Sequence, residues 1–212
     1  MQMNLECSKA GGRREARREE RRCAILAIAG RHFQELGYGG TTMSGIAAEL
    51  GGSKGTLWAY FASKEELFAA VLDSWIEQYA PLREPKPGRD LRETLVGYCT
   101  EFLTIMLSPE VTALYRLVIA EGQRFPEFGR IFYDRAPRRR HRMLARLLDA
   151  EIANGRLSPH DTLSASAQLH HSCLFHLFMH NLWGLAPDVS PARIAQDAEA
   201  AVSLFMRGYS EG

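Results

Sequence analysis

The sequence predicts an all-α protein in which an N-terminal domain of three helices precedes a larger helical domain. Apolar residues recur at intervals of three and four along most of the 212 residues, which is the period of an amphipathic helix. No segment alternates apolar and polar residues as a half-buried strand does. Prolines and glycines separate the periodic segments and indicate where the helices end.

The overall composition is that of a protein that buries a core and stays out of the membrane. Apolar residues make up 46% of the chain, and no apolar run reaches the ~18 residues that a membrane-spanning helix needs. The N-terminus is basic and polar, unlike a signal peptide. We therefore expect a cytoplasmic protein with no membrane partner.

Charge is distributed unevenly along the chain. Residues 1–64 hold 10 Lys and Arg against 6 Asp and Glu, a net charge of +4. Residues 65–212 hold 16 against 19, a net charge of −3. A basic N-terminal segment on an acidic body is the distribution expected of a protein that binds a polyanion with its N-terminal end.

The first predicted helix follows a disordered tail, which we place at residues 1–14. From Arg13 the sequence RREARREERR favours a helix, and an apolar stripe carries it on to Gly37. The stripe consists of Ile25, Leu26, Ala29, Phe33 and Leu36. The basic positions Arg17, Arg18, Arg21 and Arg22 fit either a solvated charged face or contacts with DNA phosphates.

Two short helices joined by a glycine turn follow within residues 41–64. Met43, Ile46, Ala47 and Leu50 lie on one helical face, and Thr41 or Thr42 can cap its N-terminus. Gly51 and Gly52 end this helix, because glycine reaches the left-handed backbone conformation without steric cost. Ser53 caps the next helix, whose buried side would be Leu57 and Phe61.

The outward side of this second helix suits a nucleic acid. It carries small residues for close approach, a hydroxyl, one cation and two aromatic rings, on Lys54, Gly55, Thr56, Trp58 and Tyr60. A helix, a short turn with glycine and a second helix form the DNA-binding helix-turn-helix arrangement. We assign residues 15–62 to this domain and residues 63–212 to a regulatory and dimerisation domain.

The stretch closely resembles the DNA-binding domain of the tetracycline-repressor (TetR) family of bacterial one-component regulators. The matching residues are Thr42, Ile46, Ala47, Leu50, Gly51, Ser53, Lys54, Gly55, Thr56, Leu57, Tyr60, Phe61, Ser63, Lys64, Glu65 and Leu67. Trp58 stands where the family commonly has a tyrosine. The resemblance implies a transcriptional repressor that binds a double-stranded DNA operator.

Specific DNA contacts are assigned on this basis. Lys54, Thr56 and Ser44 are expected at base edges, and Gly55 is expected to permit close approach. Contacts with the DNA backbone are expected from Thr42, Trp58, Tyr60 and Lys64, and Ser53 belongs to the same binding set. A phosphate would explain the cation of Lys64 at a helix N-terminus, where the dipole disfavours it.

The remaining helices follow from the same signals. One helix begins at Ser63 and breaks at Pro81, and residues 81–88 (PLREPKPG) form a linker. Further helices are predicted at 90–107, from Pro109 to near Gly122, at 161–184 and at 191–208. Residues 125–154 are predicted to form one long helix or two, with a kink at Pro137. The segment EVTALYRLVIAEGQRFPEF and the helix after it resemble the C-terminal regulatory domain of AefR-like members of the TetR family.

A regulatory domain of this kind needs an apolar pocket with a few polar groups. Candidate pocket residues are aromatic or methionine side chains on the surrounding helices, with ordinary core packing as the alternative for each. They are Trp75, Tyr79, Tyr98, Phe102, Met106, Tyr115, Phe132, Phe175, Phe178 and Met179. No buried charge recurs among them, which favours a small apolar or aromatic effector.

The last two predicted helices are expected to pair with those of a second copy into a four-helix bundle, giving a homodimer on a palindromic operator. The candidate interface residues are Leu174, Leu177, Leu182, Ile194, Ala198, Val202 and Phe205.

The histidine-rich segment from His170 to His180 offers an alternative function. His176 and His180 are one turn apart, near His170 and Cys173, which would suit a metal-responsive regulator or a metal-dependent enzyme. The segment lacks the glutamate of a metalloprotease motif and a second ligand pair. No catalytic triad, phosphate-binding glycine loop or paired-carboxylate motif stands out either. We therefore predict no enzyme activity, no metal and no cofactor.

Overall fold

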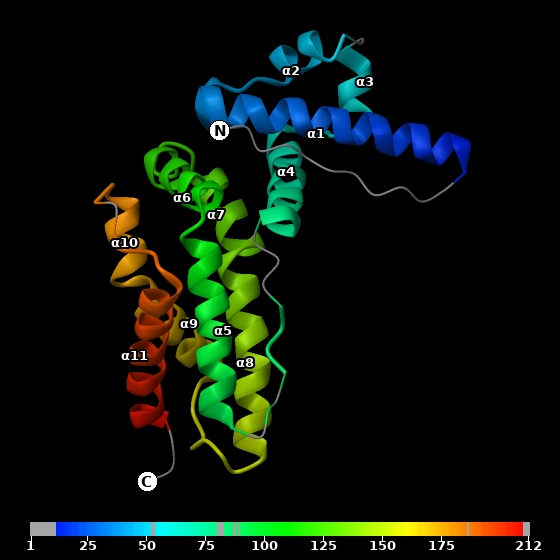
Figure 1. Ribbon diagram of the computed structural model, residues 1–212. Coiled ribbons are helices and arrows are strands. Elements are labelled where there is room, and N and C mark those ends of the chain that lie inside the picture. Colours follow the sequence, from blue (N-terminus) through cyan, green and yellow to red (C-terminus); the bar gives the residue numbers. More distant parts are fainter. Residues whose placement is uncertain are drawn as a thin grey trace. The chain divides into compact units, whose positions relative to one another are not determined.

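The computed structural model describes residues 12–51, 54–79, 83–86, 88, 90–185 and 187–209. Every regular element in these residues is a helix, which confirms the predicted all-α class (Figure 1). Eleven α-helices are assigned in them: α1 (Arg13–Gly40), α2 (Met43–Glu49), α3 (Lys54–Trp58), α4 (Lys64–Tyr79), α5 (Leu91–Met106), α6 (Pro109–Glu121), α7 (Pro126–Arg135), α8 (Pro137–Ala153), α9 (Thr162–Leu174), α10 (Leu177–Leu182) and α11 (Pro191–Tyr209).

The structure settles one predicted helix boundary and differs at two others. The segment 125–154, predicted as one long helix or two, is two helices, because Ala136 leaves helical geometry with φ −111° and ψ −80°. The helix predicted at 161–184 is interrupted at His176, with φ −103° and ψ −83°, and becomes α9 and α10. The predicted tail at 1–14 lies outside the described residues up to residue 11, and α1 already begins at Arg13.

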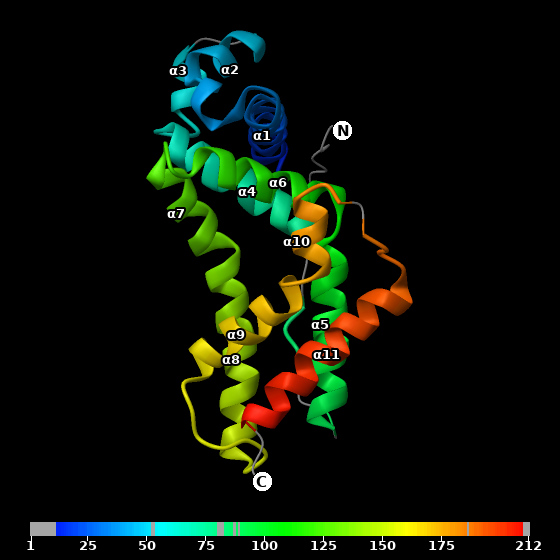
Figure 2. The ribbon, with the colours of Figure 1, turned by 90° about the vertical axis from the view of Figure 1, so that its left-hand side faces the viewer.

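The chain forms two compact units, which we describe separately. Unit 1 is Met1–Pro81 with Leu114–Ala136, and unit 2 is Leu82–Ala113 with Pro137–Gly212. Unit 1 therefore contains the predicted DNA-binding segment 15–62 together with α4, most of α6 and α7. Its helices α2 and α3 lie on one side of α1, and α4 lies on the other (Figures 1 and 2).

The core of unit 1 is built around aromatic rings from α1, α4 and α7. Phe33, Tyr38, Phe68 and Phe128 are fully buried. The Tyr38 ring lies 5.8 Å from Phe33 and 4.7 Å from Phe128 between ring centres. Burying side chains of this size dominates the stability of such a core. Tyr38 therefore lies at the centre of this aromatic core.

A single glutamate joins the end of α6 to the turn before α2. Glu121 Oε2 accepts a hydrogen bond from the Gly39 backbone N–H at 2.7 Å. Gly37, at φ 71° and ψ 177°, provides the space, since a Cβ there would lie 2.6 Å from Glu121 Oε1. This backbone region is essentially restricted to glycine. The α1–α2 turn is thus held by a residue from a distant part of the chain.

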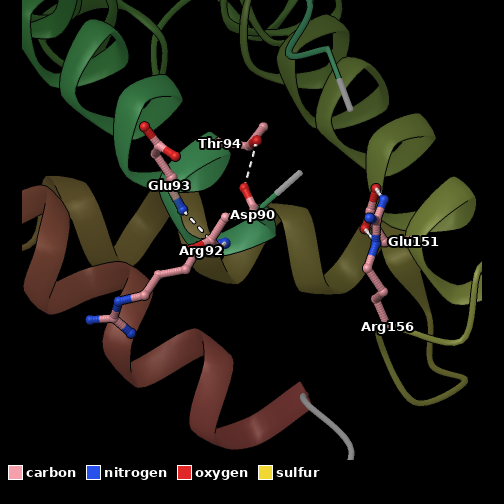
Figure 3. Close-up of polar contacts among 6 residues, drawn as sticks. All are labelled: Asp90, Arg92, Glu93, Thr94, Glu151 and Arg156. Atoms are coloured by element: carbon pink, nitrogen blue, oxygen red, sulfur yellow. Dashed lines mark hydrogen bonds and ion pairs between the residues drawn. The ribbon is translucent and has the colours of Figure 1, made fainter. Parts of the chain in front are cut away.

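Unit 2 is a bundle in which α5 packs against α11 and α8 packs against α9 (Figure 2). Asp90 caps α5 by accepting hydrogen bonds from the Arg92 and Glu93 N–H groups at 2.8 and 3.4 Å (Figure 3). Arg92 also pairs with Glu199 and donates to Ser203 Oγ at 2.6 Å, which ties α5 to α11. At the end of α8, buried Glu151 pairs with Arg156 at 2.7 Å (Figure 3).

Among the described residues, no single helix is both long and apolar enough to cross a membrane, although the bent pair α5 and α6 passes that test by length and composition when taken together.

Candidate nucleic-acid interface and regulatory site

Helix α2 is capped by Thr42, one of the two predicted caps. The Thr42 side chain accepts a hydrogen bond from the Gly45 N–H at 3.1 Å. Thr41 instead is buried, and its hydroxyl donates to the Gly37 carbonyl at 2.7 Å. Ile46 and Ala47 face the core of unit 1, whereas Ser44 is exposed. Ser44 and Thr42 are therefore available to a partner.

Helix α3 presents the predicted recognition surface. Leu57 and the following Phe61 are buried, which turns the opposite side of the helix outward. Gly55 is exposed, Thr56 is half-buried and the Trp58 side chain is 43% exposed. Ser53 and the side chain of Lys54 lie outside the described residues. An exposed ring of this size beside an exposed glycine is a contact surface that the fold itself does not use.

Tyr60 and Lys64 both have partners within unit 1. Tyr60 is half-buried, and the Arg18 guanidinium lies 5.9 Å from the centre of its ring. Lys64 Nζ donates to the Tyr38 carbonyl at 3.0 Å and lies 4.1 Å from the Tyr38 ring centre. The cation at the N-terminus of α4 thus has a carbonyl and an aromatic face as partners, and its presence does not require a phosphate.

The start of α4 is capped by Ser63 and Glu66. Ser63 Oγ accepts from the Glu66 N–H at 3.2 Å, while Glu66 Oε2 accepts from the Ala62 N–H at 2.7 Å, one residue before the N–H used in a capping box. Backbone hydrogen bonding and the Ser63 side chain lower the pKa of Glu65. Burial, followed by the charge of Glu65, raises the pKa of Tyr38, so that its phenol stays protonated and donates to Glu65 Oε1 at 3.3 Å.

Helix α2 is fixed to α1 by a second charged contact. Glu49 pairs with Arg31, and its Oε2 lies 2.7 Å from His32 Nε2. The hydrogen bond from His32 is the main cause of the lowered pKa of Glu49. These contacts orient α2, and with it α3, on one side of α1.

The predicted pocket residues are divided between the two units. In unit 1, Trp75 and Phe132 are buried and Tyr79 and Tyr115 half-buried in the aromatic core. In unit 2, Tyr98, Phe102, Met106 and Phe178 are buried and Met179 is half-buried. Phe175 is 81% exposed and lies at the surface of unit 2.

A buried group of polar and aromatic side chains lies between α5, α8 and α9. His170 Nδ1 faces the Ser166 carbonyl at 2.8 Å, so this nitrogen carries the proton, and Nε2 accepts from the Tyr98 hydroxyl at 2.8 Å. The centre of the His170 ring lies 4.6 Å from that of Phe102 and 5.2 Å from that of His141. The Arg140 guanidinium carbon lies over the Phe102 ring, 5.6 Å from its centre. We call Tyr98, Phe102, Arg140, His141 and His170 the polar-aromatic cluster.

Both buried histidines of this cluster are held neutral. Burial, aided by the charge of Arg140, lowers the pKa of His170 to about 3. The same causes lower the pKa of His141 to about 4. The sequence identified Tyr98 and Phe102, but nothing in the local pattern indicated that Arg140 and His141 would join them.

The predicted dimer residues largely face the core of their own unit. Leu177, Ile194, Ala198, Val202 and Phe205 are buried within the chain, so their side chains are not available to a partner. Leu174 and Leu182 are half-buried. The large apolar side chains that α9–α11 and their connections expose are instead Leu163, Phe175, Trp183, Leu185, Val189 and Leu204.

Two of these exposed residues, Phe175 and Leu204, line a surface groove of about 300 Å³, together with Ser172, His176, Asp197, Ala200 and Ala201.

The histidines predicted as alternative metal ligands have other partners. His176 Nδ1 lies 3.0 Å from Asp197 Oδ2 and 2.9 Å from the Arg193 guanidinium. In the ranges that the structure covers, no group of three or more His, Cys, Asp or Glu residues could hold a metal ion. Nothing in the geometry supports the metal-dependent alternative.

Comparison with known protein families agrees with this architecture. Residues 93–211 match the model described as "AefR-like transcriptional repressor, C-terminal domain", and residues 25–71 match the model of "Bacterial regulatory proteins, tetR family". The chain belongs to the TetR family. Members of this family are DNA-binding transcriptional regulators.

Individual relatives agree with this assignment. The HTH-type transcriptional regulator RutR of Escherichia coli (strain K12) is 32% identical over 134 residues, which cover 53% of this chain and 63% of RutR. A structure titled "Flavonoid-responsive Regulator FrrA" is 30% identical with a TM-score of 0.82, over 90% of this chain and 97% of that one. A TetR-family structure from Mesorhizobium loti is 25% identical with a TM-score of 0.75, over 91% and 98% of the two chains.

Proposed function

We propose that this TetR-family regulator is a homodimeric repressor that leaves a palindromic operator when a small aromatic effector binds. The observation that carries the proposal is the outward side of α3, where exposed Gly55 and Trp58 lie opposite buried Leu57. Residues 93–211 match a family model described as that of a transcriptional repressor, which supports repression rather than activation.

DNA contact is proposed for both helices of the helix-turn-helix. Ser44, Lys54 and Thr56 are proposed at base edges, since short polar groups and cations on a helix can read the major groove. Thr42 and Trp58 are proposed at the DNA backbone, with Ser53 and Tyr60 beside them. Lys64 is proposed to contribute to DNA binding indirectly. Its ammonium donates a hydrogen bond to the Tyr38 carbonyl and so holds the α1–α2 turn that precedes α2.

The polar-aromatic cluster is proposed as the part of the regulatory domain that senses the effector. Aromatic rings provide stacking surfaces, while Tyr98, His170 and Arg140 supply hydrogen-bonding groups within an apolar surrounding. FrrA, which is 30% identical, is named as flavonoid-responsive, and a flavonoid combines flat rings with phenolic hydroxyls. We therefore propose an aromatic effector that carries hydroxyl or carboxylate groups.

The proposed dimer uses the exposed apolar side chains of α9 to α11 in place of the core residues first predicted. Phe175 and Leu204 are 81% and 59% exposed and line the same groove. Exposed apolar residues grouped in this way mark a protein–protein interface more often than an open surface. With two-fold symmetry, each protomer supplies one α3, which matches an operator made of two inverted half-sites.

Selection from a random library of double-stranded DNA tests this proposal. Repeated binding and amplification should enrich a site with two-fold symmetry, whose half-site centres are about 34–36 Å or somewhat more apart, because each protomer supplies one α3. Sequencing the enriched pool reads out the symmetry directly. Enrichment of no sequence, or of a site without inverted half-sites, would contradict the proposal.

A further inference from the structure

The first three turns of α1 carry a basic face that the family resemblance does not account for. Residues 13–24 lie before the start of the TetR DNA-binding match at residue 25, yet they continue α1 without a break. They contain six arginines and three glutamates. In Figure 1 these turns extend along α1 past α3.

The arginines share a direction on the helix. At about 100° per residue, Arg14, Arg17 and Arg21 fall within about 60° of one another, and we call these three the arginine face. Of the glutamates, Glu15 and Glu19 lie on the opposite side, and Glu19 pairs with Arg22 at 3.5 Å. Glu20 lies at the edge of the arginine face. The segment is therefore polarised and not uniformly mixed in charge.

Contacts further along α1 establish where this face points. Arg14 and His32 are 18 residues apart, which is five whole turns, so they project in the same direction. His32 contacts Glu49 of α2 at 2.7 Å. The arginine face thus lies on the side of α1 that carries the helix-turn-helix. Arg18, next to this face, lies over the ring of Tyr60, just after α3.

The side chains of the arginine face are free to meet a partner. Arg14 and Arg17 are exposed, and Arg21 is half-exposed. Among the residues with described positions, none of the three has a hydrogen-bond or ion-pair partner, in contrast to Arg22, Arg31 and Arg135. Unpaired guanidinium groups beside a DNA-reading helix complement the regular negative charge of a duplex.

We propose that the arginine face of α1 binds the phosphate backbone of the DNA beside the operator half-site. The inference rests on the proposed function, because α3 must first place the duplex on this side of α1. Phosphate contacts of this type add affinity and salt dependence without reading sequence. They extend the DNA contact of the family domain by the length of three helical turns.

The test compares two triple variants on the duplex that the unmodified protein selects. Arg14→Gln/Arg17→Gln/Arg21→Gln removes the arginine face while keeping good helix-forming residues. Arg139→Gln/Arg142→Gln/Arg207→Gln removes the same charge from exposed positions of α8 and α11 in unit 2. Dissociation constants are measured between about 50 and 200 mM salt, and circular dichroism confirms equal helix content.

The first variant should bind at least about tenfold more weakly at physiological salt, and its salt slope should fall by about three per protomer. The second should match the unmodified protein. If the unmodified protein binds its selected duplex and the first variant keeps its affinity and slope, this proposal is overturned while the proposed function stands. Equal losses in both variants would also overturn it, since they would reflect net charge alone. Failure of the unmodified protein to select any duplex would remove both proposals.

Discussion

Replacing Gly55 by glutamate should reduce affinity for the selected operator by about 100-fold or more, equivalent to about 3 kcal/mol. Gly55 is exposed in α3, between Lys54 and Thr56. A carboxylate there meets the negative potential of the duplex, and its bulk prevents the close approach that glycine permits. The loss should appear as a weaker dissociation constant in a fluorescence-anisotropy titration.

A matched control separates this effect from an effect on folding. Gly97 is also an exposed glycine in a helix, α5, and a Cβ there meets nothing within 4 Å. Gly97→Glu therefore introduces the same charge and the same change in helix propensity in unit 2. It should leave operator affinity within about threefold, the range of ordinary surface substitutions. Similar losses of operator affinity for both variants would contradict the assignment of α3 as the recognition helix.

Acid should destabilise the fold through His170 and His141, and this is the largest stability effect that we expect. Burial lowers the pKa of His170 to about 3 and that of His141 to about 4, below the ordinary 6.5. As pH falls through 6.5, the unfolded chain binds protons at these positions while the folded chain does not. Stability is therefore complete above about pH 6.5 and declines steadily as pH falls toward 4 and below.

The magnitude follows from the same pKa values. At pH 5 each histidine held neutral costs up to about 2 kcal/mol of folding free energy relative to neutral pH, and slightly less for His141 because its pKa is lowered less. Together they would remove a large share of the typical stability of a domain. Urea unfolding at pH 7.5 and pH 5 measures this loss.

The variant His170→Gln identifies the residue responsible. Glutamine keeps a donor for the Ser166 carbonyl and an acceptor for the Tyr98 hydroxyl but cannot gain a proton. Its stability at pH 7.5 should be lower, because the ring contacts with Phe102 are lost. Its additional loss between pH 7.5 and pH 5 should be about 2 kcal/mol smaller than that of the unmodified protein. An unchanged pH dependence would show that His170 is not the titrating group.

Helix content and the helix-turn-helix could be predicted from sequence because their signals are local. Leu57 and Phe61 repeat at helical spacing, and Thr42, Gly51 and Ser63 occupy capping positions that depend on a few neighbours. The break at His176 carries neither proline nor glycine at the interruption, so the pattern of residues 161–184 gave no sign of it.

Packing between distant segments could not be predicted in the same way. Glu121 and Gly39 are 82 residues apart, and their hydrogen bond follows from how α6 meets the α1–α2 turn. The periodicity of α11 identifies an apolar face, but Val202 and Phe205 on that face fill the core of their own unit. Leu204, between them in sequence, points outward. A single sequence does not distinguish a face that meets its own core from one that meets a partner.

The measurement that tests the central claim most directly is a titration of the operator complex with aromatic ligands. Fluorescence anisotropy of the selected duplex bound to the protein is followed as flavonoids, hydroxylated aromatic acids and, for comparison, straight-chain fatty acids are added. We predict that at least one aromatic ligand releases the DNA and raises the melting temperature of the free protein, because an effector must bind the released state more tightly than the DNA-bound state. Operator binding that is unaffected by every aromatic ligand, or release by the fatty acids alone, would contradict a repressor controlled by an aromatic effector.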